Sequence, residues 1–501
     1  TKLFMFAACT LFLAACGKQT VKIMTPPDAS NRVLFGAEQL QTTLDKAGYQ
    51  VMMQQGDTTF SDPEIKTILL TEVNDTTLKK EGFHISTTGN LTRVSGRDGS
   101  GVIYGCRELI DRVNDSDGKL NFPEELKDGP EMVLRGACVG LQKMTYLPGH
   151  GVYEYPYTPE SFPWFYDKEQ WIKYLDMLVA NRMNSLYLWN GHPFASLVKL
   201  EDYPFALEVD EETFKKNEEM FSFLTEEADK RGIFVIQMFY NIILSKPFAE
   251  HYGLKTQDRN RPITPLIADY TRKSIAAFIE KYPNVGLLVC LGEAMCTVED
   301  DVEWFTKTII PGVKDGLQAL GRTDEPPLLL RAHDTDCKLV MDAALPIYKN
   351  LYTMHKYNGE SLTTYEPRGP WSKIHTDLSS LGSIHISNVH ILANLEPFRW
   401  GSPDFVQKAV TAMHNVHGAN ALHLYPQASY WDWPYTADKL PNNEREFQLD
   451  RDWIWYQTWG RYAWNCHRDR TDEMGYWDHQ LGKFYGTSDE NASNIRVAYE
   501  E

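Results

Sequence analysis

The sequence predicts an α/β fold: a (β/α)8 TIM barrel, preceded by a small α/β domain and followed by a helical C-terminal region. Two observations carry this prediction. Between residues 131 and 438, apolar stretches alternate eight times with helical stretches, a pattern typical of parallel strands joined by crossover helices. No Gly-rich phosphate loop follows the first apolar stretch, which disfavours the alternative, a doubly wound open sheet.

Composition restricts the classes of partner. The chain has 501 residues, 43% of them hydrophobic and 24% charged, so it is long enough for more than one packed domain and has no disordered signature. Its formal net charge of −18 repels polyanions at long range, which argues against nucleic acid or an anionic membrane surface as the main partner. An anionic ligand would need a local cluster of basic side chains.

Residues 1–19 are predicted to be a lipoprotein signal peptide. They contain a lysine, an apolar stretch too short to span a bilayer, and small residues that lead to a cysteine. The run LAAC at 13–16 resembles the bacterial lipobox, which implies that Cys16 is lipidated; a plain signal peptide is the alternative. We therefore expect an exported bacterial lipoprotein, periplasmic or on the outer-membrane surface, that touches the membrane only through its N-terminal lipid anchor.

Residues 20–130 are predicted to form the small α/β domain. Their pattern reads as a strand, an amphipathic helix, a second strand, a hairpin and a helix that opens after glycines, at 21–27, 29–49, 65–72, 83–98 and 99–113. The stretch SGRDGSGVIYGCREL at 95–109 resembles the small domain that precedes the catalytic barrel in several glycoside hydrolases. These include the hexosaminidases and the family 67 and 115 α-glucuronidases.

Residues 131–438 are predicted to form the barrel. The eight expected strands lie at 133–141, 184–191, 233–240, 285–292, 327–334, 351–357, 388–396 and 421–428. Residues 439–501 are expected to be helical and are rich in tryptophan and tyrosine, and WGRYAWN at 459–465 resembles the opening of the helical C-terminal region in those α-glucuronidases. The chain starts without methionine and stops inside an expected helix, as a fragment would.

Polar and aromatic residues follow the expected strands, at the end of the barrel where active sites lie. Aromatic faces beside amides suit sugar rings, whose CH faces stack while their hydroxyls need directional hydrogen bonds. The candidate substrate-binding residues are Lys143, Trp189, Asn190, His192, Asn241, Arg331, His333, His355, Lys356, Arg399, Trp400, Tyr425, Trp431 and Trp433. The histidines could equally be satisfied supporting residues, and the tryptophans could be core.

Glycoside hydrolysis needs two carboxyl groups, one protonated to assist the leaving oxygen and one ionised. Glu293 ends the fourth apolar run, where partial burial suits the acid role; the alternative is that it caps the helix starting near Thr297. Glu396 is the expected base or nucleophile, with Asp334 as its main competitor and Glu366 a weaker one.

Basic residues give a clue to the substrate. Lys143, Arg331, Lys356 and Arg399 all fall at strand ends and together could bind a uronic carboxylate or a sulfate; ion pairing with neighbouring acids is the alternative for each. The cysteines show no metal-binding spacing, so no disulfide, metal or cofactor is predicted.

The order of small domain, barrel and tryptophan-rich tail resembles the family 67 and 115 α-glucuronidases. That resemblance implies removal of glucuronic acid from xylan side chains with inversion, with Glu293 at the position of the acid. Hexosaminidases carry an Asp-Glu pair after the fourth strand, whereas Gly292 precedes Glu293, which disfavours substrate-assisted cleavage. The expected function is an exo-acting glycoside hydrolase on an oligosaccharide or polysaccharide, anionic in character. The alternative is a non-catalytic glycan-binding lipoprotein on a degenerate barrel.

Overall fold

The computed structural model describes residues 19–60, 62–141, 156–240, 243–360, 362–390, 401–425, 434–439, 441–442 and 444–500. The chain divides into two units, residues 1–129 and 130–501. Each is described by itself. Among the described residues, every helix is too short or too polar to cross a membrane.

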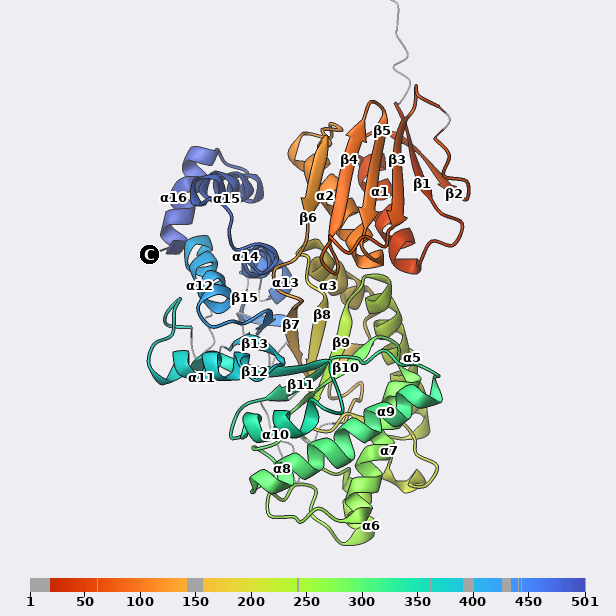
Figure 1. Ribbon diagram of the computed structural model, residues 1–501, viewed down its shortest axis with the longest axis vertical. Helices are drawn as coiled ribbons and strands as arrows, with labels where there is room; N and C mark the ends of the chain where they lie inside the picture. The colour runs from red at the N-terminus through yellow and green to blue at the C-terminus, as the bar shows by residue number, and fades with distance from the viewer. Residues whose placement is uncertain are drawn as a thin grey trace, which may run out of the picture. The chain divides into compact units, whose positions relative to one another are not determined.

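The first unit is a six-stranded sheet with two helices against one face (Figure 1). The strands lie in the order β2-β1-β3-β5-β4-β6. Their bounds are β1 Thr20–Thr25, β2 Gln50–Gln55, β3 Lys66–Glu72, β4 Phe83–Thr88, β5 Leu91–Gly96 and β6 Glu125–Asp128, and the helices are α1 Asn31–Lys46 and α2 Gly99–Asp115.

The glycines that open α2 have a steric reason. A Cβ on Gly101 would lie 2.3 Å from the Gly82 carbonyl oxygen, and one on Gly96 would lie 2.3 Å from the Val102 nitrogen. Asp98 caps the helix by accepting a hydrogen bond from Gly101 N at 2.9 Å. The glycine pattern therefore lets the first turn of α2 press against the sheet.

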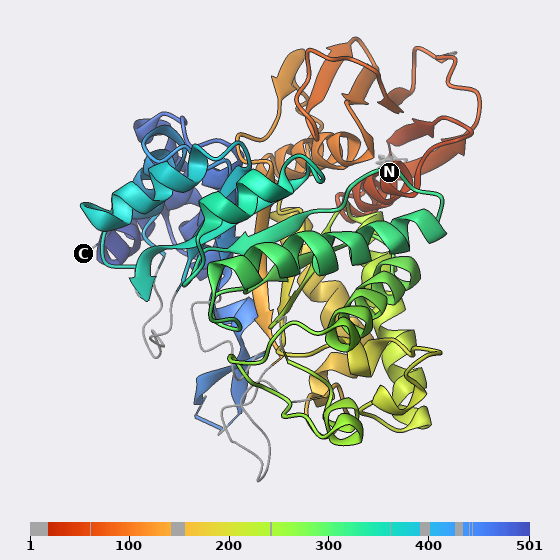
Figure 2. The ribbon, with the colours of Figure 1, turned by 60° about the horizontal axis from the view of Figure 1, so that its bottom comes forward.

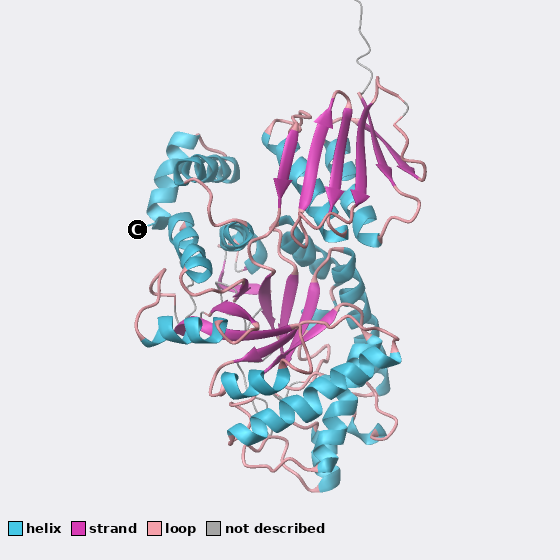
Figure 3. Ribbon diagram, viewed as in Figure 1, coloured by secondary structure: helices cyan, strands magenta, loops and turns pink. Residues whose placement is uncertain are grey.

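The second unit is a closed barrel of eight parallel strands, as the sequence predicts (Figure 3). The strands are β7 Leu134–Gly140, β8 Ser185–Trp189, β9 Phe234–Phe239, β10 Val285–Val289, β11 Leu328–Arg331, β12 Leu351–Glu360, β13 Ile384–Val389 and β14 Ala421–Leu424. Aliphatic and aromatic side chains from all eight fill the interior. The helices between strands include α3 Lys168–Ala180, α4 Phe194–Leu197, α5 Glu211–Lys230, α6 Lys246–Tyr252, α7 Pro265–Lys281, α8 Val298–Trp304, α9 Ile310–Ala319, α10 Cys337–Ala344, α11 Pro370–Ser379 and α12 Pro403–Asn415.

The observed strands overlap their predicted ranges but differ from them at their ends, the seventh most of all. The seventh was expected at 388–396, but β13 spans Ile384–Val389, so Glu396 lies seven residues beyond its end. The sixth was expected to stop at Tyr357, but β12 continues to Glu360. The seventh strand was misplaced because the polar residue His385 interrupts its apolar sequence. The His385 ring makes hydrogen bonds to Thr353 and to His375 of α11.

The C-terminal region is helical, with α13 Gln448–Arg451, α14 Trp453–Trp464, α15 Arg470–Tyr485 and α16 Asp489–Glu500 (Figure 2). Helix α14 buries Trp455, Trp459 and Trp464 completely. A small hairpin of β15 Tyr435–Lys439 and β16 Arg445–Phe447 precedes the helices, although Arg445–Phe447 was expected to be helical. The stacked rings of Tyr435 and Phe447, 5.2 Å apart, hold the two strands together.

A chain of neutral histidines joins β12, β13 and α11. His375 Nε2 lies 3.0 Å from the Tyr357 carbonyl oxygen, which can only accept, so this nitrogen donates. His375 Nδ1 must then accept from His385 Nε2 at 2.8 Å, and His385 Nδ1 accepts from the Thr353 hydroxyl at 3.0 Å. Both ring nitrogens of His375 and of His385 therefore make hydrogen bonds while the two imidazoles are neutral.

This chain makes stability depend on pH. Burial lowers the pKa of His375 to about 3, whereas an unfolded histidine binds a proton near pH 6.5. Between these values only the unfolded state takes up the proton, so stability should fall by up to about 1.4 kcal/mol per pH unit below pH 6.5 for this residue. In thermal melts from pH 7.5 to 5, His375→Gln should show a shallower decline than the wild type, and His251→Gln, which alters an exposed histidine, should not. An equal slope in all three would contradict this account.

Candidate active site

An ion pair between Arg331 and Glu293 occupies the C-terminal end of the barrel. Arg331 is the last residue of β11, and Glu293 follows β10 by four residues. Arg331 Nη1 donates to Glu293 Oε2, and the two side chains are only 7% and 23% exposed. His333 Nδ1 lies 3.1 Å from the other oxygen, Glu293 Oε1. Both carboxylate oxygens therefore face nitrogen groups.

Aromatic rings surround the guanidinium. Arg331 lies over the Trp189 ring, 5.1 Å from its centre, and Trp189 makes edge contacts with Tyr240 and Tyr425. The His390 ring lies 4.4 Å from that of Tyr425. These residues come from the ends of five different strands, which is the usual construction of a barrel active site. They offer ring faces beside fixed charges, as a sugar requires.

The site carries positive charge at neutral pH. Burial acts to lower the pKa of Arg331, but the neighbouring Cys290, Tyr425 and Glu293 outweigh it and raise that pKa, so the guanidinium stays charged. Burial, reinforced by Lys356 and Arg331, lowers the pKa of His390 to about 2. Burial also lowers the pKa of His355. The Arg331 guanidinium thus stays charged beside the neutral imidazole of His390.

Gly292 fixes the peptide that leads into Glu293. Its N–H donates to Thr335 Oγ1 at 3.0 Å, and its carbonyl accepts from Arg259 Nη2 at 2.6 Å. A Cβ at this position would lie 1.9 Å from the Asp334 carbonyl oxygen. The position therefore has no room for the aspartate of a hexosaminidase Asp-Glu pair.

Glu293 does not cap the next helix, which was the structural alternative for it. Helix α8 begins at Val298, and Thr297 is its N-cap, accepting from Asp300 N at 3.1 Å. The carboxyl of Glu293 is held at the mouth by its ion pair with Arg331 instead.

The structure brings some of the other predicted residues together. Trp189, Arg331, His333 and Tyr425 lie around Glu293, and Lys356 in the middle of β12 acts on His390 at the same site. The His355 ring instead contacts Trp371 and His375 of α11. Asp334 is exposed, with φ of 52°, and its Oδ1 is 3.8 Å from His333 Nε2. The remaining candidates Cys16, Lys143, Asn241, Glu396, Arg399, Trp400, Trp431 and Trp433 lie outside the described residues.

Asn190 and His192 have structural partners. Asn190 Nδ2 donates to the Leu141 carbonyl at 3.1 Å, and its Oδ1 accepts from His192 N at 2.9 Å. The His192 ring lies 3.4 Å, atom to atom, from the Tyr270 hydroxyl, and burial lowers its pKa to about 4. These contacts belong to the packing of β8 against α7.

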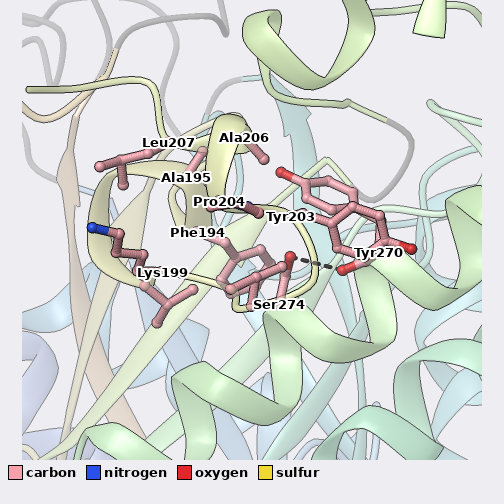
Figure 4. Close-up of a pocket in the computed structure, with 11 residues that line it drawn as sticks. Phe194, Ala195, Lys199, Tyr203, Pro204, Ala206, Leu207, Tyr270 and Ser274 are labelled. Atoms are coloured by element: carbon pink, nitrogen blue, oxygen red, sulfur yellow. Dashed lines mark hydrogen bonds between the residues drawn. The ribbon is translucent and has the colours of Figure 1, made fainter. Parts of the chain in front are cut away.

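The cavity beside α4 and α7 is too small for a sugar. Figure 4 shows Phe194, Tyr203 and Tyr270 on its wall, with Ser274 Oγ donating to the Tyr270 carbonyl at 2.8 Å. It encloses only about 10 Å³, room for one water molecule at most. Glu366 instead lines an open groove of about 400 Å³ with Tyr365, Asp404 and Lys408.

Sequence reasoning missed several residues here. His390 directly follows the end of β13. Had the seventh strand been predicted at its observed range, His390 would have stood directly after its end and would have been a candidate residue. Arg259 and Thr335, which hold Gly292, carry no signal of their own because they lie 33 and 43 residues from it in the chain.

Comparison with known proteins identifies the family. No family model and no curated protein matches the chain. The chain is 73% identical to a solved structure of a GH138 enzyme targeting pectin rhamnogalacturonan II; the match covers 96% of this chain and 69% of that one, with a TM-score of 0.91. The chain belongs to glycoside hydrolase family GH138. It is a glycosidase, which excludes the non-catalytic alternative, and its family is GH138 where the sequence suggested families 67 and 115.

More distant structures share only the fold with this GH138 chain. The GH20 β-N-acetylhexosaminidase from Streptomyces coelicolor A3(2) is 12% identical over 93% of this chain and 92% of its own, with a TM-score of 0.56. The Flavobacterium johnsoniae chitobiase is 12% identical over 89% of this chain and 66% of its own, with a TM-score of 0.55. Both fit the expected layout of a small domain followed by a barrel.

The hydrogen bonds from Gly292 to Thr335 and from Arg259 to Gly292 form a clamp on this peptide, which can be tested by adding a methyl group at position 292. Gly292→Ala forces the peptide away from the Asp334 carbonyl, and a displacement of about 1 Å in a catalytic group can cost about 10²-fold in rate. We expect kcat to fall by about that factor. The matched control is Gly475→Ala on α15, where an added Cβ meets nothing within 4 Å. Equal kcat in the two variants would contradict a role for the clamp.

Proposed function

We propose that this GH138 enzyme hydrolyses a glycosidic bond to a uronic acid in a plant pectic glycan such as rhamnogalacturonan II, with Glu293 as one of its two carboxyl groups. The observation that carries the proposal is the buried Arg331 beside Glu293, with Lys356 as a second cation at the same end of the barrel. The GH138 relative that is 73% identical to this chain targets a polymer of that class. An acidic sugar would supply the anion that these cations bind.

The Arg331 guanidinium can pair first with Glu293 and then with a sugar carboxylate. Without substrate its guanidinium is paired with Glu293. A sugar carboxylate that reaches the guanidinium competes for the same charge, and Glu293 is then free to hold a proton and give it to the leaving oxygen. Binding of the correct acidic sugar would in this way prepare the acid that cleaves it.

The second carboxyl comes from a short set of acids. Glu396 is the proposed base or nucleophile; in the sequence it follows the end of β13 by seven residues. Asp334 is exposed and contacts His333, and Glu366 lies in the groove with Tyr365. Chemical rescue of each alanine variant by azide would identify a nucleophile or base among them.

Export remains part of the proposal. The LAAC run at 13–16 supports lipidation of Cys16 and a place in the periplasm or on the outer membrane, where a polysaccharide would be met. Metabolic labelling with a clickable palmitate, in the full chain and in Cys16→Ser, tests it.

The role of Glu293 can be separated from that of the second carboxyl. Glu293→Gln keeps the shape but cannot donate a proton, so turnover of a pectic oligosaccharide should fall by about 10²–10⁴-fold. An aryl uronide with a good leaving group needs little acid assistance and should be affected much less. If both substrates lost turnover equally and azide restored neither, Glu293 would not be the acid.

Arg331 should determine the preference for an acidic sugar. We expect Arg331→Gln to lower kcat/KM on the uronide by about 10²-fold or more, because a sugar carboxylate loses its buried partner. The effect on the methyl ester of the same substrate should be clearly smaller, since the ester carries no charge. Arg331→Lys keeps the charge and should retain part of the discrimination. An equal loss on acid and ester would assign Arg331 to positioning Glu293 alone.

A further inference from the structure

Three potential metal ligands meet at the end of the barrel opposite the active site. Glu131 precedes β7, whereas Cys466 and His467 lie in the connection between α14 and α15. A carboxylate oxygen, the thiol sulfur and an imidazole nitrogen from these residues all lie within 4.8 Å of one another, and Glu131 Oε1 is 3.5 Å from His467 Nε2. We propose that Glu131, Cys466 and His467 bind a zinc ion.

The donor set selects the metal. Thiolate, imidazole and carboxylate are the ligands of Zn²⁺, which binds them at about 2.0–2.3 Å, so ligand atoms around one ion lie roughly 3–4 Å apart. Small side-chain rotations would bring the three atoms to that spacing. Ca²⁺ and Mg²⁺ prefer oxygen ligands alone and would gain nothing from the sulfur.

Hydrogen bonds fix the backbone around the cluster. Glu131 N donates to the Trp464 carbonyl at 2.9 Å, and Glu131 Oε2 accepts from Cys466 N at 2.8 Å. Gln407 of α12 donates to the carbonyls of Cys466 and Arg468, at 3.2 and 2.8 Å. The site is thus prepared before an ion arrives, which lowers the ordering cost of binding.

The cluster also provides access and a fourth position. Cys466 is buried but His467 is half exposed, so an ion can enter from solvent on the imidazole side. A water molecule would complete a tetrahedron.

The test is a Co²⁺ titration of the full chain after treatment with a chelator. We expect one equivalent of Co²⁺ to produce a sulfur-to-cobalt charge-transfer band in the near ultraviolet, and Zn²⁺ to abolish it. Cys466→Ser should lose the band, whereas the matched control Cys296→Ser, which removes an exposed thiol elsewhere, should keep it. No band in the wild type, or the same band in Cys466→Ser, would overturn the proposal.

A second variant covers the case in which Cys466→Ser fails to fold. His467→Asn changes a half-exposed side chain and should keep the circular dichroism spectrum of the wild type. We expect its dissociation constant for Zn²⁺, measured by competition with a chromophoric chelator, to rise about tenfold or more. An unchanged constant would exclude His467 as a ligand and overturn the three-residue site.

Discussion

The side chain of Arg331 places a permanent positive charge among Trp189, Cys290, Tyr240 and Tyr425, where water can hardly reach it. Moving a guanidinium into such surroundings costs several kcal/mol, and the partner carboxylate of Glu293 offsets that cost only in good geometry. A buried ion pair is therefore a poor device for stability alone. Its value lies in chemistry, because a third charge that enters the site changes the state of both partners.

The remainder of the barrel mouth keeps that pair in position. β10 and β11 are adjacent parallel strands in register at Leu287 and Leu328, which brings the residues after each strand together. Thr335 and Arg259 hold the Gly292 peptide from two sides, and no side chain fits between Gly292 and Asp334. The apolar side chains of the barrel interior pack beneath the ion pair and support it. The geometry at Glu293 thus depends on three separate loops, those after β10, after β11 and between α6 and α7.

Much of this arrangement follows from the sequence, and the failures have physical causes. Glu293 and Arg331 could be located because each follows an unbroken apolar run; Arg331 is the last residue of β11, and Glu293 lies four residues beyond β10. The seventh strand was misplaced because His385 turns away from the barrel interior and is satisfied by His375, so its polarity hid the strand. Residues such as Thr335 act only through the folded chain, and no local pattern marks them.

The most direct measurement of the central claim is a crystal structure of Glu293→Gln soaked with an acidic oligosaccharide from rhamnogalacturonan II. The account predicts a sugar carboxylate in ion-pair contact with the Arg331 guanidinium and the scissile oxygen within hydrogen-bonding reach of residue 293. A sugar bound in the groove beside Tyr365, or one in the barrel mouth that turns a neutral face to Arg331, would contradict it.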